Sequence, residues 1–279
     1  MSYSAEISRA NPSCFLFLID QSGSMADTFA GSATQKAQSV ADIINRLISR
    51  LVVSCSKQEG VRNYFDVGVI GYGGRVGFVW EGTLAGNEVI PISQLADNPL
   101  RIEERTRKVS DHAGGLVDER VKFPVWFDPV AENGTPMCAA IELANEILTK
   151  WVSQHPTSYP PRVLHVTDGE ATDGDPRAAL EKLTLLGTED GNVLLFNVHL
   201  SANENAAAIS FPGPTVRLPD EYAQLLFDTA SPLPSFFCAV ASDEYSLKVD
   251  DGAKAFVLNA DVKLAVEALE IGTRPANLR

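Results

Sequence analysis

Short apolar runs alternate with longer amphipathic segments along most of the chain. The first run, residues 15–19, is apolar at every position, which is typical of a strand buried on both faces of a sheet. Residues 32–54 follow with apolar side chains at the three- and four-residue spacing of an amphipathic helix. The same alternation recurs downstream, with further strands expected at 65–72, 76–80, 163–167, 193–200 and 255–258 and further helices at 135–151, 176–186, 222–229 and 261–271.

This alternation predicts an α/β fold, a doubly wound and mainly parallel sheet with helices on both faces. Residues 76–80 follow their neighbouring strand after a glycine-rich turn, so we expect them to form one antiparallel edge strand. We find no internal repeat, low-complexity stretch or linker, and therefore expect a single domain over residues 1–279.

Two stretches interrupt the alternation and are interpreted as insertions. Residues 98–128 are densely charged and end in a compact aromatic group, and residues 231–249 carry prolines and aromatics without a clear period. The first stretch is either a loop packed on the body or a partner-binding element beside the candidate site described next, because functional loops gather at such rims.

Three hydroxyl- and carboxyl-bearing residues follow the first strand at alternate positions: Asp20, Ser22 and Ser24. Loops that leave the carboxyl ends of strands are where open α/β sheets bind their ligands. A set of oxygen ligands without histidine or cysteine favours a hard cation such as Mg²⁺. Two later segments add Thr135, in Asn-Gly-Thr-Pro-Met, and Asp168, in the Thr-Asp-Gly that ends the strand at 163–167.

Asp-x-Ser-x-Ser, Gly-Thr-Pro and Thr-Asp-Gly in this order resemble the intact metal-ion-dependent adhesion site of von Willebrand factor A (VWA) domains, over roughly residues 13–271. The resemblance implies that Ser22 and Ser24 bind the metal directly and that Asp20 acts through water. It also implies that Thr135 is the ligand that engages the metal in the high-affinity state and that Asp168 is the second carboxylate. Mn²⁺ or Ca²⁺ could replace Mg²⁺.

The same resemblance implies a partner protein that supplies an Asp or Glu side chain to the metal. Two aspartates that act partly through water leave a divalent ion incompletely neutralised, and a further carboxylate would be attracted to it. The downstream acids Glu170, Asp173 and Asp175 either form a solvated loop, with Asp173 or Asp175 capping the helix after Pro176, or line the rim of the site. Similar acidic loops occur in stand-alone bacterial VWA proteins of tellurite-resistance and stress systems, which implies a scaffold in an intracellular stress, signalling or conflict complex.

Composition narrows the possible partners and the compartment. The net charge of −13 argues against nucleic acid, and no apolar run is long enough to span a membrane. The polar residues 1–11 lack the pattern of a secretory signal, and the four cysteines are widely spaced, so we expect a cytoplasmic protein without disulfides.

An enzyme is the rival class, because an apolar strand that ends in a magnesium-binding aspartate also describes haloacid-dehalogenase-type phosphatases. Those enzymes need a second acid two residues later, where this chain has Ser22. The chain also lacks a phosphate-binding Gly-rich loop with a following Lys-Ser/Thr. Its four histidines have no spacing that suits a zinc site or a catalytic triad. We therefore expect a binding protein and no catalytic residues.

Overall fold

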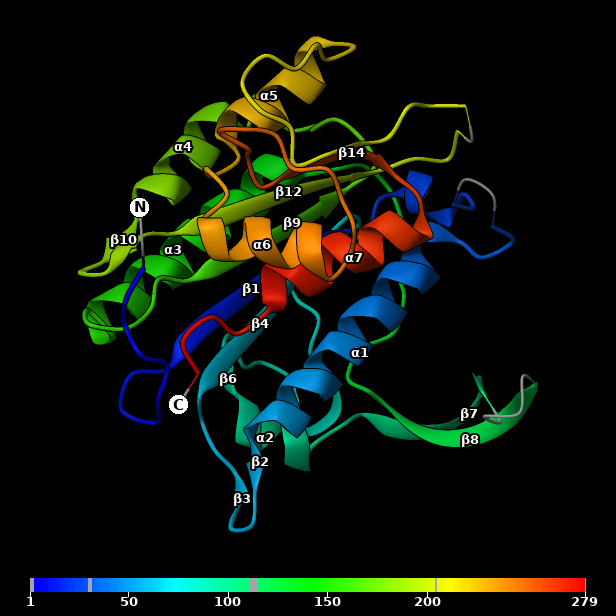
Figure 1. Ribbon diagram of the computed structural model, residues 1–279, viewed down its shortest axis with the longest axis vertical. Coiled ribbons are helices and arrows are strands. Elements are labelled where there is room, and N and C mark those ends of the chain that lie inside the picture. Colours follow the sequence, from blue (N-terminus) through cyan, green and yellow to red (C-terminus); the bar gives the residue numbers. More distant parts are fainter. Residues whose placement is uncertain (1–2, 30–31, 111–114, 204, 279) are drawn as a thin grey trace.

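The computed structural model describes residues 3–29, 32–110, 115–203 and 205–278 (Figure 1). Its central strand is β1 (Ser13–Asp20), which pairs in parallel with β4 (Phe65–Tyr72) on one side and β9 (Arg162–Thr167) on the other. All of β1 is buried, because both of its edges are paired and both of its faces are covered.

The predicted mainly parallel sheet is confirmed. Its strand order is β13-β14-β12-β9-β1-β4-β5, where β12 (Leu194–Leu200) and β14 (Phe256–Ala260) continue the parallel part. The expected antiparallel edge strand is β5 (Val76–Phe78). Two short antiparallel strands were not predicted, β6 (Ile90–Pro91) against β4 and β13 (Ile209–Ser210) against β14.

Helices cover both faces of the sheet (Figure 1). One face carries α1 (Lys36–Cys55), α2 (Ile92–Asp97), α6 (Ser235–Asp243) and α7 (Val262–Thr273), and the other carries α3 (Met137–Gln154), α4 (Arg177–Leu185) and α5 (Glu221–Thr229). The remaining short elements are η1 (Gly23–Ala26), η2 (Gly82–Leu84), β2 (Ser56–Lys57), β3 (Gly60–Val61), β10 (Gly187–Thr188) and β11 (Gly191–Asn192). Within the described ranges, no helix is both long and apolar enough to cross a membrane.

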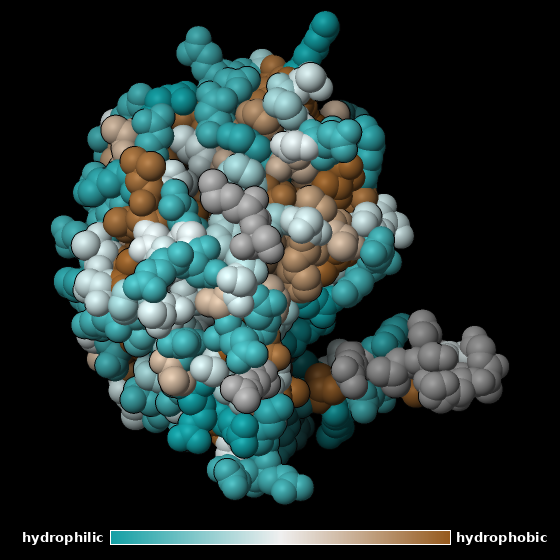
Figure 2. All heavy atoms as spheres, turned by 60° about the vertical axis from the view of Figure 1, so that its left-hand side comes forward, coloured by the Kyte–Doolittle hydropathy of each residue, from teal (hydrophilic) through white to brown (hydrophobic). Residues whose placement is uncertain are grey.

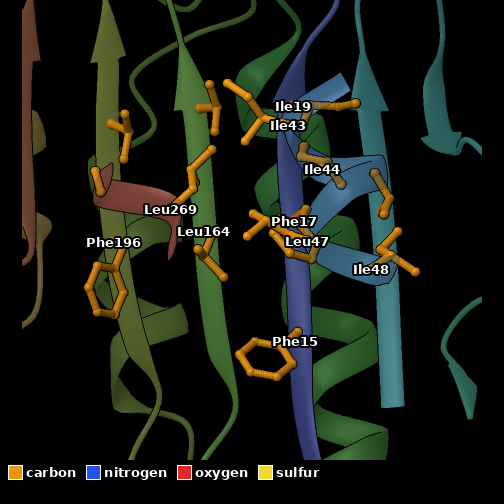
Figure 3. Close-up of a cluster of buried hydrophobic side chains, with 14 of the residues drawn as sticks. Phe15, Phe17, Ile19, Ile43, Ile44, Leu47, Ile48, Leu164, Phe196 and Leu269 are labelled. Atoms are coloured by element: carbon orange, nitrogen blue, oxygen red, sulfur yellow. The ribbon is translucent and has the colours of Figure 1, made fainter. Parts of the chain in front are cut away.

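Alternate residues of β1 supply the two halves of the core. Phe15, Phe17 and Ile19 point toward α1, where they meet its buried isoleucine and leucine side chains (Figure 3). Cys14, Leu16 and Leu18 pack on the opposite face with α3. Because successive strand residues face opposite sides, a strand covered on both faces needs the unbroken apolar run seen in the sequence.

Residues 231–249 contain a helix that we did not predict. α6 begins after Pro234 and packs against α7, with Phe237 fully buried against Phe196. Its apolar residues do not lie on one stripe, since the neighbouring Phe236 is 39% exposed, and this obscures the helical period.

Residues 98–128 form a β-hairpin instead of a loop packed on the body. β7 (Arg101–Ser110) and β8 (Leu116–Val125) pair along their full length and stand out from the rounded body (Figures 1 and 2), while residues 111–114 lie outside the described ones. The hairpin exposes the apolar side chains of Ile102 and Val117. Backbone pairing and charged side chains, such as Arg105 in its ion pair with Asp42 of α1, hold this element together.

The hairpin is fastened to the body at its carboxyl end. The Trp126 and Phe127 side chains are buried, and the Trp126 indole Nε1 donates to the carbonyl of Leu95 at 2.8 Å. The buried Asn45 amide of α1 holds the same segment, because its Oδ1 accepts from the Trp126 N–H and its Nδ2 donates to the Phe127 carbonyl.

We predict that Asn45→Ala lowers the free energy of unfolding by about 2–3 kcal/mol, because it leaves a buried N–H and a buried carbonyl without partners. Urea denaturation followed by far-UV circular dichroism measures the loss. The control is Arg46→Ala on the exposed face of the same helix, with an expected change of less than about 0.5 kcal/mol. An equal, small effect of both substitutions would contradict the anchoring role of Asn45.

Candidate functional site

The candidate site lies where the strand order of the sheet reverses. From β1 the chain crosses through α1 to β4 on one side, and the later strand β9 pairs on the other side of β1. Asp20 ends β1, and Asp168 directly follows β9. Two acids therefore flank the switch point, the position at which open α/β sheets form a ligand-binding crevice.

Asp20 is the most deeply buried member of the candidate set. Its Oδ1 accepts a hydrogen bond from the Ser22 N–H, and its Oδ2 accepts one from the Thr167 hydroxyl, both at 2.9 Å. Burial raises the pKa of Asp20, hydrogen bonds from Ser22 and Thr167 lower it, and the charge of Asp168 raises it. A cation placed nearby would favour the charged form of this carboxylate.

Hydrogen bonds connect Ser22, Ser24 and Asp168. The Ser22 and Ser24 Oγ atoms lie 3.0 Å apart, and Ser24 Oγ donates to Asp168 Oδ1 at 2.7 Å. Ser22 is buried and Ser24 is exposed, so this chain of oxygens leads from the sheet end to the surface. Four of the five sequence-predicted residues are thus brought together.

Backbone hydrogen bonds hold the loop of Thr135 close to the other four candidate residues, all of which the structure describes. The Thr135 hydroxyl itself makes no hydrogen bond to any of the four. Its loop is tied to the first one, because the Gly23 N–H donates to the Asn133 carbonyl at 2.9 Å. Thr172 holds it from the other side, donating its N–H to the Thr135 carbonyl and accepting the Thr135 N–H on its hydroxyl.

The loop after β4 packs tightly against the loop after β1. A Cβ atom at Gly73 would lie 2.3 Å from the Gln21 carbonyl oxygen, a contact that no side chain can make without moving the backbone. The Gln21 N–H also donates to the Tyr72 carbonyl at 2.7 Å, and the Gln21 carbonyl accepts from Glu132. Glycine is therefore required where the loop after β4 meets the loop after β1.

The three downstream acids have separate roles. Asp175 accepts from the Arg177 N–H at the start of α4, which agrees with the expected helix cap. Asp173 instead accepts from the Cys138 and Ala139 N–H groups at the start of α3, so of the two expected capping residues it is Asp175 that lies at α4. Glu170 is exposed.

The structure adds Lys36 to this cluster, a residue that the sequence analysis did not identify. Its Nζ lies 2.5 Å from Asp168 Oδ2, and the two side chains are only 4% and 0% exposed. Lys36 is the first residue of α1, where the helix dipole disfavours a positive charge. A lysine near the start of the helix predicted at 32–54 was the available signal, since it needs a compensating acid elsewhere in the fold.

The donor set fits a hard cation. It consists of hydroxyl and carboxylate oxygens, and no group of three or more His, Cys, Asp or Glu in the described part of the chain could hold a metal. A metal here would depend on the serine hydroxyls, as the motif requires. The Lys36 ammonium already occupies a cation position beside Asp168.

A buried polar row crosses the sheet among β4, β9 and β12. Tyr72 Oη lies 2.8 Å from His165 Nε2, and His165 Nδ1 lies 3.0 Å from Asn197 Oδ1. Since Asn197 Nδ2 donates to the Leu226 carbonyl, its Oδ1 is the acceptor and the neutral imidazole has both nitrogens satisfied. This agrees with a structural role for His165; of the other histidines, His112 lies outside the described residues.

Comparisons with known proteins give only distant likeness. Neither a protein-family model nor a curated protein matches the sequence. Among solved structures, the chain is similar to a von Willebrand factor type A protein from Catenulispora acidiphila (14% identity, 69% of this chain, TM-score 0.42), of which it spans about a third (34%).

It is also similar to manganese-loaded TRAP protein of Plasmodium vivax (13% identity, 98% of this chain and 78% of that one, TM-score 0.45). A third is proximal thread matrix protein 1 from the mussel byssus with a zinc-occupied MIDAS motif (13% identity, 82% and 43%, TM-score 0.40). Because these TM-scores lie below 0.5, the likeness decides neither metal, partner nor activity for this chain.

We predict that buried His165 makes the stability of the protein fall as pH drops from about 6.5 toward 4. Burial lowers the pKa of His165 from 6.5 to about 4, so in this window the unfolded chain binds a proton that the folded chain excludes. One such group contributes a slope of up to about 1.4 kcal/mol per pH unit. Burial also lowers the pKa of His199, which adds in the same direction.

Urea denaturation at a series of pH values measures this slope. His165→Gln should flatten it, whatever its effect on stability at neutral pH. The control is His155→Gln, because His155 lies partly exposed against Trp151. An unchanged slope in His165→Gln would show that His165 does not exclude the proton.

Proposed function

We propose that this chain is a metal-dependent protein-interaction module of the VWA type. In this proposal Asp20, Ser22, Ser24, Thr135 and Asp168 hold Mg²⁺, with Mn²⁺ or Ca²⁺ as alternatives, and a partner protein contributes an Asp or Glu. The observation that supports it most strongly is the continuous row of Ser22, Ser24 and Asp168 oxygens above the buried Asp20.

Each residue has a distinct task in this proposal. Asp20 orders its own loop through the Ser22 N–H and joins β1 to β9 through Thr167. Ser24 lies exposed in the middle of the row, where its hydroxyl bonds to both Ser22 and Asp168. A bound divalent ion would supply positive charge there, and a partner's carboxylate would be attracted to it.

Thr135 is proposed to engage when the partner binds. Its main chain is held on both sides, through Asn133 and Thr172, whereas its hydroxyl is not bonded to the rest of the candidate set. A small movement of this loop about its hydrogen bond with the first loop, between Gly23 and Asn133, would bring the Thr135 hydroxyl toward Ser22 and Ser24.

The broader setting is also a proposal. The four cysteines are free and the net charge is −13, which is compatible with a cytoplasmic protein that does not bind nucleic acid or membranes. We propose a scaffold in an intracellular stress, signalling or conflict complex of bacterial type. The β7–β8 hairpin, with exposed Ile102 and Val117, offers a second surface for a partner.

The chain is proposed to act by binding and not by catalysis. Ser22 occupies the place where a phosphatase of the rival class needs an acid, and its hydroxyl lies beside Ser24 with no histidine of the described residues bonded to it. Phosphoryl transfer by the rival mechanism therefore lacks its second acid, and Ser22 lacks the imidazole base of a hydrolase triad.

We predict that Ser22→Ala and Asp20→Asn each weaken Mg²⁺ or Mn²⁺ binding at least about tenfold, because each removes an oxygen ligand or its charge. Isothermal titration calorimetry measures the affinity, and circular dichroism checks that the fold is intact. Ser56→Ala, on the exposed strand β2 and outside the candidate set, is the control and should bind the metal as the wild type does. Wild-type affinity in both site variants would rule out this ligand set.

We further predict no metal-dependent phosphatase activity. The purified protein with Mg²⁺ should not hydrolyse p-nitrophenyl phosphate above the rate of a buffer control. Turnover that disappears in Asp20→Ala would overturn the binding-module proposal in favour of the enzyme.

A further inference from the structure

We propose that Lys36 is an internal cation that competes with the divalent ion for Asp168 and thereby holds the candidate site in a low-affinity state. This inference rests on the proposed function, because it concerns regulation of the same site. It arises from a buried ion pair at that site, between Lys36 Nζ and Asp168 Oδ2 at 2.5 Å.

Burial makes this ion pair obligatory in the absence of another cation. The Asp168 side chain has no exposure to solvent and that of Lys36 has 4%, so neither charge is screened by water. A buried charge left without its partner is strongly destabilising. Asp168 therefore requires a positive neighbour, and either Lys36 or a divalent ion can fill that role.

The hydrogen bonds of Asp168 place the two cations in competition. Oδ1 accepts from Ser24 and Oδ2 from Lys36, so both oxygens of the carboxylate are engaged. A divalent ion held by Ser22 and Ser24 would lie on the Oδ1 side, close enough to repel the ammonium group. Lys36 must then move away or remain at a cost in metal affinity.

The position of Lys36 in the chain links it to the serine loop. Its N–H donates to the Asp27 carbonyl at 2.9 Å, and Asp27 directly follows η1, which carries Ser24. Lysine at the first position of α1 is disfavoured by the helix dipole, so α1 alone gives no reason for it. Its ion pair with Asp168 supplies that reason.

The charges also explain how a partner would overcome the competition. With a divalent ion bound and Lys36 retained, the two carboxylates leave one net positive charge at the site. An incoming Asp or Glu neutralises that charge, so metal and acidic partner should bind more tightly together than either alone. Without Lys36 this excess charge disappears.

The test compares Mg²⁺ and Mn²⁺ affinity in Lys36→Met, Lys36→Arg and wild-type protein by isothermal titration calorimetry. Methionine removes the charge with little change in length, and we expect at least about tenfold tighter metal binding. Arginine keeps the charge and should leave the affinity close to wild type. Lys57→Met, on the exposed β2, controls for loss of a distant positive charge and should have no effect.

Thermal unfolding supplies a second readout. In EDTA, Lys36→Met should melt below the wild type because Asp168 has lost its partner, and added Mg²⁺ should raise its melting temperature more than that of the wild type. If Lys36→Met does not fold, Lys36→Gln serves in the same comparison.

The outcomes separate this inference from the proposed function. If the wild type binds metal and Lys36→Met binds it with the same or lower affinity, the proposed competition is overturned and the proposed function stands. If Lys36→Met binds metal and the wild type does not, the proposed competition is supported and the metal dependence of the wild type is contradicted. No binding by either protein at millimolar metal overturns both.

Discussion

The buried carboxylates at the ends of β1 and β9 are the constraint on which the rest of the candidate site depends. Parallel pairing of these strands brings Asp20 and Asp168 to one edge of the sheet, where neither is well hydrated. Desolvated acids need hydrogen bonds or cations. Thr167 at the end of β9, the Ser22 N–H and Ser24 after β1, and Lys36 at the start of α1 supply them, so these segments meet where two charges need compensation.

The parallel core and four of the five candidate residues could be predicted because their signals are local. The run at residues 15–19 requires a strand covered on both faces, and Asp20 to Ser24 lie in its exit loop whatever the rest of the chain does. Their convergence with Asp168 follows from the common edge of parallel strands, and the hydrogen bonds among them match that expectation.

Other features depend on contacts between distant segments and could not be predicted from a local pattern. The pairing of Lys36 with Asp168 joins residues far apart in the chain, and a single lysine near the start of a helix does not indicate which acidic residue it pairs with. The β7–β8 hairpin is densely charged, and its half-buried positions include Glu103 and Arg105, so the alternation of burial along β7 does not appear as an alternation of apolar residues. Asp173 caps α3 instead of the nearer α4 because the loops after β9 and before α3 are packed together.

The central claim is that a divalent ion binds among Ser22, Ser24, Thr135 and Asp168. Paramagnetic broadening of backbone amide signals by Mn²⁺ in a two-dimensional ¹⁵N–¹H NMR spectrum locates such an ion without any knowledge of the partner. The account predicts that substoichiometric Mn²⁺ broadens the Gly23, Gly134 and Gly169 amides first and that excess Mg²⁺ restores them. Broadening confined to other surface acids, such as Asp250 and Asp251, with sharp signals from the three glycines would contradict it.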